Sequence, residues 1–395
     1  MGMKSDHRTA WAEFLSGDER ASSGPFRASI EATRNCGLRC IMCSQSWRPE
    51  YRRRDPAFDM TPAVFEAVIR ELFGCLERVN FQGYGETTVS PHWPRLLELC
   101  APFVGKMEFE IVSNLIRQDP EMWRKMVRMG FRIFASCDGA VEETFRAIRA
   151  GARLGTVLDN LEVLRRVRED SGGRAPTLLV TLQRLNAREM PLFVDLAVRS
   201  GVERIIYSTV AEPMPHGLDD AARRWRGASE AGVVRGLSRA VDWAVARLNK
   251  PRVATIHSLP RGEVDDLVGR TLRRSVELGI PVEFTDAFLA VAASQPAPRL
   301  ESLGLEEGIA ESIKVSVHHR CFKAHSTVVV NYRGDVGLCN HLVSDDNWEQ
   351  MGNLLRDPLE KIWDSPRYRQ SRGCLAQGKP VGSACRWCHA YRVAE

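Results

Sequence analysis

The residues best suited to chemistry are three cysteines that fall within eight positions near the start of the chain. Cys36, Cys40 and Cys43 have the spacing Cys-x3-Cys-x2-Cys and follow a short apolar run. Three thiolates on so short a loop can bind three corners of an iron–sulfur cubane and leave the fourth iron open to another ligand. A zinc ion with a fourth protein ligand is the alternative, although no histidine follows at zinc-finger spacing.

A second group of cysteines lies near the end of the chain. Cys321 and Cys339 flank an apolar stretch and an Arg-Gly-Asp turn that together predict a β-hairpin, which would bring the two thiols close. Cys385 and Cys388 follow as a Cys-x2-Cys pair. Four such thiols can bind either a structural zinc ion or a [4Fe–4S] cluster. A bound metal would also stabilise a segment that is small for a core of its own.

The composition limits where such sites operate. The chain has 395 residues, of which 44% are hydrophobic and 27% charged, with a formal net charge of +5, as in an ordinary globular protein. No apolar stretch approaches the roughly 20 residues that span a bilayer, and the polar N-terminal segment lacks the apolar core of a signal peptide. We therefore expect a cytoplasmic protein whose eleven cysteines stay reduced. The scattered arginines predict no nucleic-acid partner.

Short β-type runs alternate with helical patterns over the first half of the chain. The predicted strands span residues 28–34, 78–82, 107–112, 131–135, 177–183 and 204–209. The predicted helices span residues 62–76, 93–100, 120–129, 141–148, 157–169 and 187–200. Such alternation favours a parallel sheet with right-handed crossovers, so we expect an α/β fold with a partial (β/α)6 barrel. Functional residues are then expected at the carboxyl ends of the strands.

The remaining segments suggest how the chain is divided. Residues 1–27 form a polar N-terminal lead, and residues 28–310 form the barrel. The barrel includes a largely helical insert at about 214–310, within which residues 281–285 predict a further strand. Residues 311–395, with short strands, frequent turns and dense cysteine, predict a small β-hairpin and helix domain that a bound metal would stabilise.

Polar residues at the ends of the predicted strands appear in an order that resembles the radical S-adenosylmethionine (SAM) enzymes. The stretch NCGLRCIMC resembles that family's cluster loop, and FQGYGETTVSP resembles its glycine-rich segment. The motifs VSN, SCDG and LQR end the third, fourth and fifth predicted strands. The resemblance implies that Cys36, Cys40 and Cys43 bind the [4Fe–4S] cluster that contacts SAM. The SAM-contacting residues that it implies are Met42, Gly83, Tyr84, Gly85, Glu86, Ser113, Asn114, Ser136, Asp138, Gln183 and Arg184.

Three residues of the cluster loop and the glycine-rich segment need comment. Glu86 offers an anion to the ammonium group of SAM, beside glycines that let the backbone approach the ligand. Met42 departs from the family pattern, in which an aromatic residue often precedes the third cysteine, but a thioether can fill the same space near adenine. Thr87 stands where many relatives have proline.

The C-terminal cysteines resemble the auxiliary-cluster domain called twitch, an abbreviated form of the SPASM domain, from Cys321 to Cys388. The resemblance implies that Cys321, Cys339, Cys385 and Cys388 bind one auxiliary [4Fe–4S] cluster. The chain would then hold two clusters together with SAM, and iron–sulfur is favoured over zinc. Because only Cys374 is left over in this region, two auxiliary clusters are not expected.

The resemblance also implies a reaction. The reduced cluster cleaves SAM to a 5′-deoxyadenosyl radical, which abstracts hydrogen from an unactivated carbon, with electrons from a flavodoxin- or ferredoxin-type protein. The short lead favours a small-molecule natural-product substrate of sugar, aminocyclitol or nucleoside type, giving oxidation or epimerisation. The alternatives are peptide modification by cross-linking or epimerisation, sulfur insertion from the auxiliary cluster, and a non-catalytic iron–sulfur or zinc binding module.

The remaining cysteines are candidates for a thiol that returns hydrogen to a substrate radical. Cys374 is the preferred donor. Its alternative roles are an exposed surface cysteine or an exchangeable cluster ligand. Cys75 and Cys100 lie in apolar helical runs and are better read as buried small hydrophobes. Cys137 lies between Ser136 and Asp138, so strand alternation should turn it away from the barrel interior.

Overall fold

The computed structural model describes residues 4–47, 53–210, 256–285, 321–339, 350–379 and 381. Cys385 and Cys388 therefore lie outside the described residues, as does the predicted insert apart from residues 256–285.

A single ten-stranded sheet forms the centre of the fold, in the order β12-β11-β10-β1-β3-β4-β5-β7-β8-β9. The eight strands from β10 to β9 run parallel, and β11 and β12 join one edge antiparallel. These strands are β1 (Arg27–Ile30), β3 (Arg78–Phe81), β4 (Glu108–Ser113), β5 (Arg132–Ser136), β7 (Thr177–Leu182), β8 (Arg204–Thr209), β9 (Val282–Phe284), β10 (Thr327–Val330), β11 (Asp335–Gly337) and β12 (Gln350–Asn353). The predicted α/β class with an open, partial barrel is confirmed.

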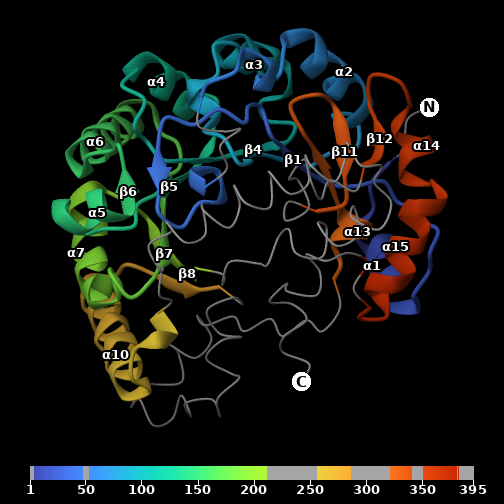
Figure 1. Cartoon of the computed structure of the whole chain (residues 1–395). Helices are drawn as coiled ribbons and strands as arrows, with labels where there is room; N and C mark the ends of the chain where they lie inside the picture. The colour runs from blue at the N-terminus through green and yellow to red at the C-terminus, as the bar shows by residue number, and fades with distance from the viewer. Residues whose placement is uncertain are drawn as a thin grey trace, which may run out of the picture.

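Helices cover the outside of this sheet in an arc, with α1, α14 and α15 grouped on the opposite side of the molecule (Figure 1). The arc contains α2 (Pro62–Leu72), α3 (Trp93–Cys100), α4 (Pro120–Arg128), α5 (Glu142–Ile148), α6 (Leu154–Ser171), α7 (Met190–Ser200) and α10 (Arg261–Leu278). The other group contains α1 (His7–Ser16), α13 (Lys323–Ser326), α14 (Leu359–Trp363) and α15 (Pro366–Ala376). None of the described helices combines the length and the apolar character that crossing a bilayer requires.

Local sequence signals explain where several helices begin. The Thr61 hydroxyl accepts a hydrogen bond from the Val64 backbone N–H at the start of α2, and Pro62 occupies its first position. At the start of α4, the Asp119 carboxylate likewise accepts a hydrogen bond from the Met122 backbone N–H, and Pro120 occupies the first position. Helix α2 then buries its apolar face against the sheet, which is why its 3.6-residue pattern was visible in the sequence.

The predicted barrel strands are confirmed to within a few residues, and residues 204–209 match β8 at both ends. The predicted strand at 281–285 is confirmed as β9, and the hairpin between Cys321 and Cys339 is confirmed as the antiparallel pair β10 and β11. Two differences stand out. The first strand ends at Ile30 instead of residue 34, and the polar lead forms the helix α1, capped by Asp6.

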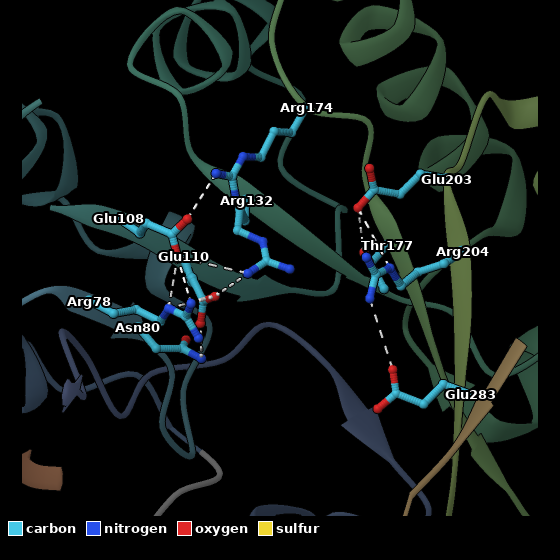
Figure 2. A network of polar contacts seen from close by, with 10 residues as sticks. All are labelled: Arg78, Asn80, Glu108, Glu110, Arg132, Arg174, Thr177, Glu203, Arg204 and Glu283. Carbon is cyan, nitrogen blue, oxygen red and sulfur yellow. Dashed lines mark hydrogen bonds and ion pairs between the residues drawn. The ribbon is translucent and has the colours of Figure 1, made fainter. Parts of the chain in front are cut away.

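A network of charged residues lies at the amino ends of the barrel strands (Figure 2). Arg78 of β3 binds Glu108 of β4 at 2.6 Å, and Arg132 of β5 binds Glu110 at 3.1 Å. Arg174, just before β7, also reaches Glu108, at 2.8 Å. These pairs link neighbouring strands at one end of the sheet and leave the loops at the opposite, carboxyl end for a site.

Candidate active site

The loop that carries the first three cysteines begins where β1 ends. It contains the two-residue strand β2 (Arg39–Cys40), which pairs antiparallel with β6 (Arg149–Ala150), so that Cys40 lies directly opposite Arg149. The next residue continues this pairing, since the Ile41 N–H donates to the Ile148 carbonyl at 2.9 Å. A backbone bond of 3.0 Å from the Cys43 N–H to the Cys40 carbonyl then turns the chain back. The β2–β6 pairing therefore fixes the middle of the loop to the segment that follows β5.

All three thiols of this loop are half-buried and free of disulfides. Burial raises the pKa of Cys36 to about 11 and that of Cys40 to about 12, and it also raises the pKa of Cys43. Cys43 lies near enough that its charge would raise the pKa of both other thiols further. Among the described residues, no three His, Cys, Asp or Glu side chains converge tightly enough to bind one metal ion.

Two glycines of the predicted SAM-binding segment hold this loop by close backbone approach. A Cβ added at Gly85 would lie 2.2 Å from the Thr33 carbonyl oxygen, and one at Gly83 would lie 2.4 Å from Cγ of Glu31. Only glycine permits such contacts. The loop after β3 thereby packs directly on the segment that leads from β1 to Cys36.

The residues between β1 and Cys36 leave the sheet because they form a buried ion pair. Glu31 and Arg34 are 1% and 0% exposed, and the Arg34 guanidinium donates to Oε2 of Glu31 at 3.1 Å. The other oxygen of Glu31 accepts a 3.0 Å hydrogen bond from the Tyr84 N–H in the glycine-rich segment. The pair therefore ties the cysteine loop to the end of β3, and it explains why β1 stops four residues earlier than predicted.

Glu86 joins the ends of β3 and β4. Its Oε1 accepts hydrogen bonds from the Ser113 hydroxyl at 2.9 Å and from the Thr88 hydroxyl at 2.7 Å. Its Oε2 accepts one bond, of 2.7 Å, from the Asn114 N–H. Since a carboxylate oxygen can accept more than one bond, Oε2 keeps capacity for an added ammonium group. The Asn114 side chain extends this link to the cluster loop, with its amide nitrogen 4.0 Å from the Cys36 sulfur.

Asp138 joins the ends of β5 and β7 in a similar way. It is fully buried, and its carboxylate accepts bonds from Arg149 Nε at 2.8 Å and from the Thr181 N–H at 2.7 Å. Through Arg149 it reaches β6 and hence Cys40, and the positive charge of Arg149 helps to lower the pKa of all three loop thiols against the effect of burial. Sequence reasoning gave Arg149 no role, because its position depends on the β2–β6 pairing.

Gln183, which directly follows β7, has a buried amide with no hydrogen-bond partner among the described residues. It is 1% exposed, and both its amide nitrogen and its amide oxygen lack a hydrogen bond. A buried amide without a partner costs free energy unless a ligand or water satisfies it, so Gln183 is a candidate for a ligand contact at this end of the barrel. The neighbouring Arg184 is exposed. Met42, Tyr84 and Ser136 are half-buried in the same group of loops.

Cys321 and Cys339 lie near the amino ends of the parallel strands, at the opposite end of the sheet from the loop of Cys36, Cys40 and Cys43. Strand β10 runs parallel to β1 with Thr327 opposite Arg27, and Cys321 precedes it by way of α13. Cys339 lies two residues beyond β11, at the Thr327 end of β10. Because four strand residues span about 10 Å, the two cysteine groups are separated by at least the length of β1.

Cys374 lies beside this second group. It is half-buried near the end of α15, and the next residue, Leu375, accepts a 3.3 Å hydrogen bond from the Cys321 N–H. Cys75, Cys100 and Cys137 are all buried, as expected for the first two. Cys137 is fully buried among the apolar core residues.

Comparison with known proteins agrees with this geometry. The family model for the Radical SAM superfamily matches residues 30–197, and that for the SPASM iron–sulfur cluster-binding domain matches residues 321–389. The chain belongs to the radical SAM enzymes with a SPASM domain. Radical SAM and SPASM domains bind [4Fe–4S] clusters and SAM. No curated protein matches the sequence.

Solved radical SAM structures share the fold at low sequence identity. Streptococcus suis SuiB bound to its precursor peptide SuiA has a TM-score of 0.62 and 13% identity, and the match covers 98% of this chain and 74% of SuiB. SuiB bound to S-adenosylmethionine has a TM-score of 0.62 and 14% identity, and the match covers 98% of this chain and 76% of SuiB. The enzyme anSMEcpe with bound AdoMet has a TM-score of 0.58 and 14% identity, and the match covers 88% of this chain and 82% of anSMEcpe. At this identity the likeness establishes the fold.

Proposed function

We propose that this radical SAM enzyme abstracts a hydrogen atom from a small-molecule natural product of sugar, aminocyclitol or nucleoside type, giving oxidation or epimerisation. The proposal that this site binds SAM is supported by one observation: residues at the ends of four strands, β3, β4, β5 and β7, contact the cysteine loop directly or through one another. Glycines, Glu86, Asn114 and the Asp138–Arg149 pair all connect to the loop, and the orphaned Gln183 amide lies at the same end of the barrel.

Each residue of this site has a proposed task. Cys36, Cys40 and Cys43 hold the cluster, and Oε2 of Glu86 accepts from the ammonium group of SAM. The remaining SAM contacts would come from the polar residues at the strand ends. These are Met42, Gly83, Tyr84, Gly85, Ser113, Asn114, Ser136, Asp138, Gln183 and Arg184.

When bound, the cluster and SAM supply a one-electron cleavage that yields a carbon radical able to take hydrogen from an unactivated carbon. The protein contributes position and exclusion of water. The buried pairs Glu31–Arg34 and Asp138–Arg149 keep the loop rigid without leaving a charge uncompensated beside the ligand. A flavodoxin- or ferredoxin-type protein is the proposed source of electrons.

Cys321, Cys339, Cys385 and Cys388 are the proposed ligands of one auxiliary [4Fe–4S] cluster. Cys321 and Cys339 lie at the same end of the β10–β11 hairpin, which supports a shared ligand set. The cluster would lie near the amino end of β10, away from the SAM site.

Helix α1 lies against the elements around Cys321. It packs against α13 and α15, with Trp11 and Phe14 both touching the ring of Phe322 at centroid distances of 4.9 and 5.2 Å. Residues 4–26 therefore pack on the side of the molecule that carries Cys321.

Peptide modification is the second candidate, and the solved relatives favour it. SuiB was crystallised with its precursor peptide SuiA, and anSMEcpe with a peptide named Cp18Cys. The identities of 13% and 15% limit what passes from these enzymes to this chain, so the two substrate classes call for a direct test.

The test begins with anaerobic reconstitution, iron and sulfide analysis, and a reductant-dependent assay for 5′-deoxyadenosine. About eight irons per chain are expected, the sum for two cubanes. Sugars, aminocyclitols, nucleosides and peptides are then compared for their ability to raise the rate of 5′-deoxyadenosine formation above background. Stimulation by peptides alone would replace the small-molecule proposal, and zinc without any cleavage would overturn the enzyme mechanism.

Cys374 remains the proposed hydrogen donor for an epimerisation outcome. Because it lies beside Cys321 and away from the cysteine loop, this role requires a substrate that extends toward the Thr327 end of β10. Cys374→Ala should leave SAM cleavage intact and stop formation of the epimerised product. Normal product from this variant, measured by chromatography with a deuterated solvent as the hydrogen source, would exclude the donor role. Retained iron in the same variant would exclude it as a cluster ligand.

A further inference from the structure

Positive charge and an unpartnered hydroxyl gather around Cys339. The Lys323 ammonium lies 3.9 Å from the Cys339 sulfur. Lys323 begins α13, while Cys339 follows β11, so the contact is made by the fold and not by sequence proximity. An ammonium this close to a thiolate interacts strongly with it and favours any state with more negative charge on the sulfur.

Helix α15 adds a hydroxyl to the same surroundings. Tyr368 is fully buried, and its hydroxyl makes no hydrogen bond within the part of the chain that the structure describes. Helix α15 packs against α13, the helix that begins at Lys323, and burial raises the pKa of Tyr368. A buried O–H without an acceptor is costly, and a sulfur ligand of a metal cluster is an acceptor that would relieve that cost.

One helical turn further on, Arg372 adds a buried cation. It is 0% exposed, its guanidinium lies 4.8 Å from the ring centre of Tyr368, and it donates to the carbonyls of Ala324 at 3.0 Å and Trp363 at 2.7 Å. Among the described residues, Arg372 has no carboxylate within ion-pair distance. A buried cation without a paired anion is unfavourable, so this region is suited to hold a group of net negative charge.

We propose that Lys323, assisted by the Tyr368 hydroxyl, raises the reduction potential of the auxiliary cluster at Cys339. This inference rests on the proposed auxiliary cluster. It names the residues that set the reduction potential of that cluster. A cluster with four thiolate ligands carries net negative charge that grows by one unit on reduction. A nearby cation and hydrogen-bond donor stabilise the reduced state more than the oxidised state.

The experiment isolates the auxiliary cluster in the full-length chain. A background carrying Cys36→Ala, Cys40→Ala and Cys43→Ala removes the first set of ligands, and about four irons per chain should remain. The midpoint potential of that remaining cluster is then measured by a redox titration followed by electron paramagnetic resonance. This readout does not depend on turnover.

In that background, Lys323→Met should lower the ratio of reduced to oxidised cluster at a fixed potential by roughly tenfold, as expected for loss of a charge a few ångströms away. For a one-electron couple, tenfold corresponds to about 59 mV. Lys323→Arg keeps the charge and should restore most of the wild-type potential. Lys361→Met is the matched control, since that lysine is 73% exposed on α14 and should leave the potential unchanged.

Tyr368→Phe removes only the hydroxyl, keeps the buried ring, and should lower the potential by less than Lys323→Met does. It is the second variant if Lys323→Met fails to hold iron. An unshifted potential in both variants, with iron retained, would overturn the inference and leave the auxiliary cluster standing. Absence of iron in the triple-cysteine background would overturn the cluster itself, so the two failures are distinguishable.

Discussion

The loop of Cys36, Cys40 and Cys43 and the region around Cys321 and Cys339 both place thiols near positive charge, but they balance that charge differently. Beside the first loop, Arg149 is paired with Asp138 at 2.8 Å. Near the second, Arg372 is buried and donates only to carbonyl oxygens. Among the described residues, the first region therefore pairs its buried arginine with a carboxylate, whereas Arg372 in the second has no carboxylate within ion-pair distance.

This difference suggests a division of labour. A region with balanced charges can keep its geometry before a cofactor binds, which suits a site that must admit and release SAM. A region with surplus buried positive charge gains most when its anionic group is permanently in place. The following variants test whether the two regions differ in this way.

The largest expected effect comes from removing a thiol. Cys36→Ala should reduce 5′-deoxyadenosine formation to background, because the proposed SAM-binding cluster loses a ligand. Cys321→Ala should lose about half of the iron and retain SAM cleavage, because it affects the auxiliary cluster alone. Iron analysis and the cleavage assay are run on both proteins. Full cleavage by Cys36→Ala, or none by Cys321→Ala, would remove the distinction between the regions.

Breaking the balanced pair should be the next largest effect. Arg149→Met leaves the fully buried Asp138 without its cation, which should lower the free energy of unfolding by about 3–5 kcal/mol. Anaerobic denaturant unfolding followed by circular dichroism measures this change. The control is Arg166→Met, which removes an ion pair from an arginine side chain that is 72% exposed and should give no measurable change. Equal behaviour of the two variants would contradict a structural role for the Asp138–Arg149 pair.

A smaller effect is expected from filling the close approach between the loops. Gly85→Ala forces a Cβ against the Thr33 carbonyl and should cost about 1–3 kcal/mol together with weaker SAM binding. Gly155→Ala is the matched control, since an added Cβ there meets nothing within 4 Å and the residue lies in α6. That control should be neutral or slightly stabilising. The two variants are compared by thermal unfolding and by equilibrium SAM binding. Equal stability and equal SAM affinity of the two would contradict a role for the close approach at Gly85.

The smallest effect should come from replacing Gln183. The change should leave thermal stability constant or raise it, but it should weaken SAM binding. Gln183→Leu removes a buried amide that has no protein partner, so thermal stability should stay constant or rise. The same change removes a proposed ligand contact, and the SAM dissociation constant should rise by roughly 3- to 10-fold, as for loss of one hydrogen bond. Reduced stability with unchanged SAM affinity would show that Gln183 serves the fold instead.

The sequence by itself determined the fold class, the strand positions and the first cysteine loop. The strands and helices could be predicted because their apolar periodicity is a local property of the chain, and β8 was placed to the residue. Cys36, Cys40 and Cys43 could be predicted as one site because the spacing of neighbouring ligands is fixed within eight residues. The roles of Gly83 and Gly85 were partly visible, since glycine at a strand end indicates close backbone approach.

Only the tertiary structure decided which charges and hydroxyls surround the cysteines. Arg149 reaches Cys40 through a pairing of two-residue strands that are too short to give a periodic signal. Lys323 and Tyr368 reach Cys339 from different helices, and β10 meets β1 across some 300 residues of sequence. Such contacts depend on how elements pack, whereas periodicity and spacing depend only on neighbouring residues. This is why the candidate ligands could be predicted from the chain, but the groups that surround them could not.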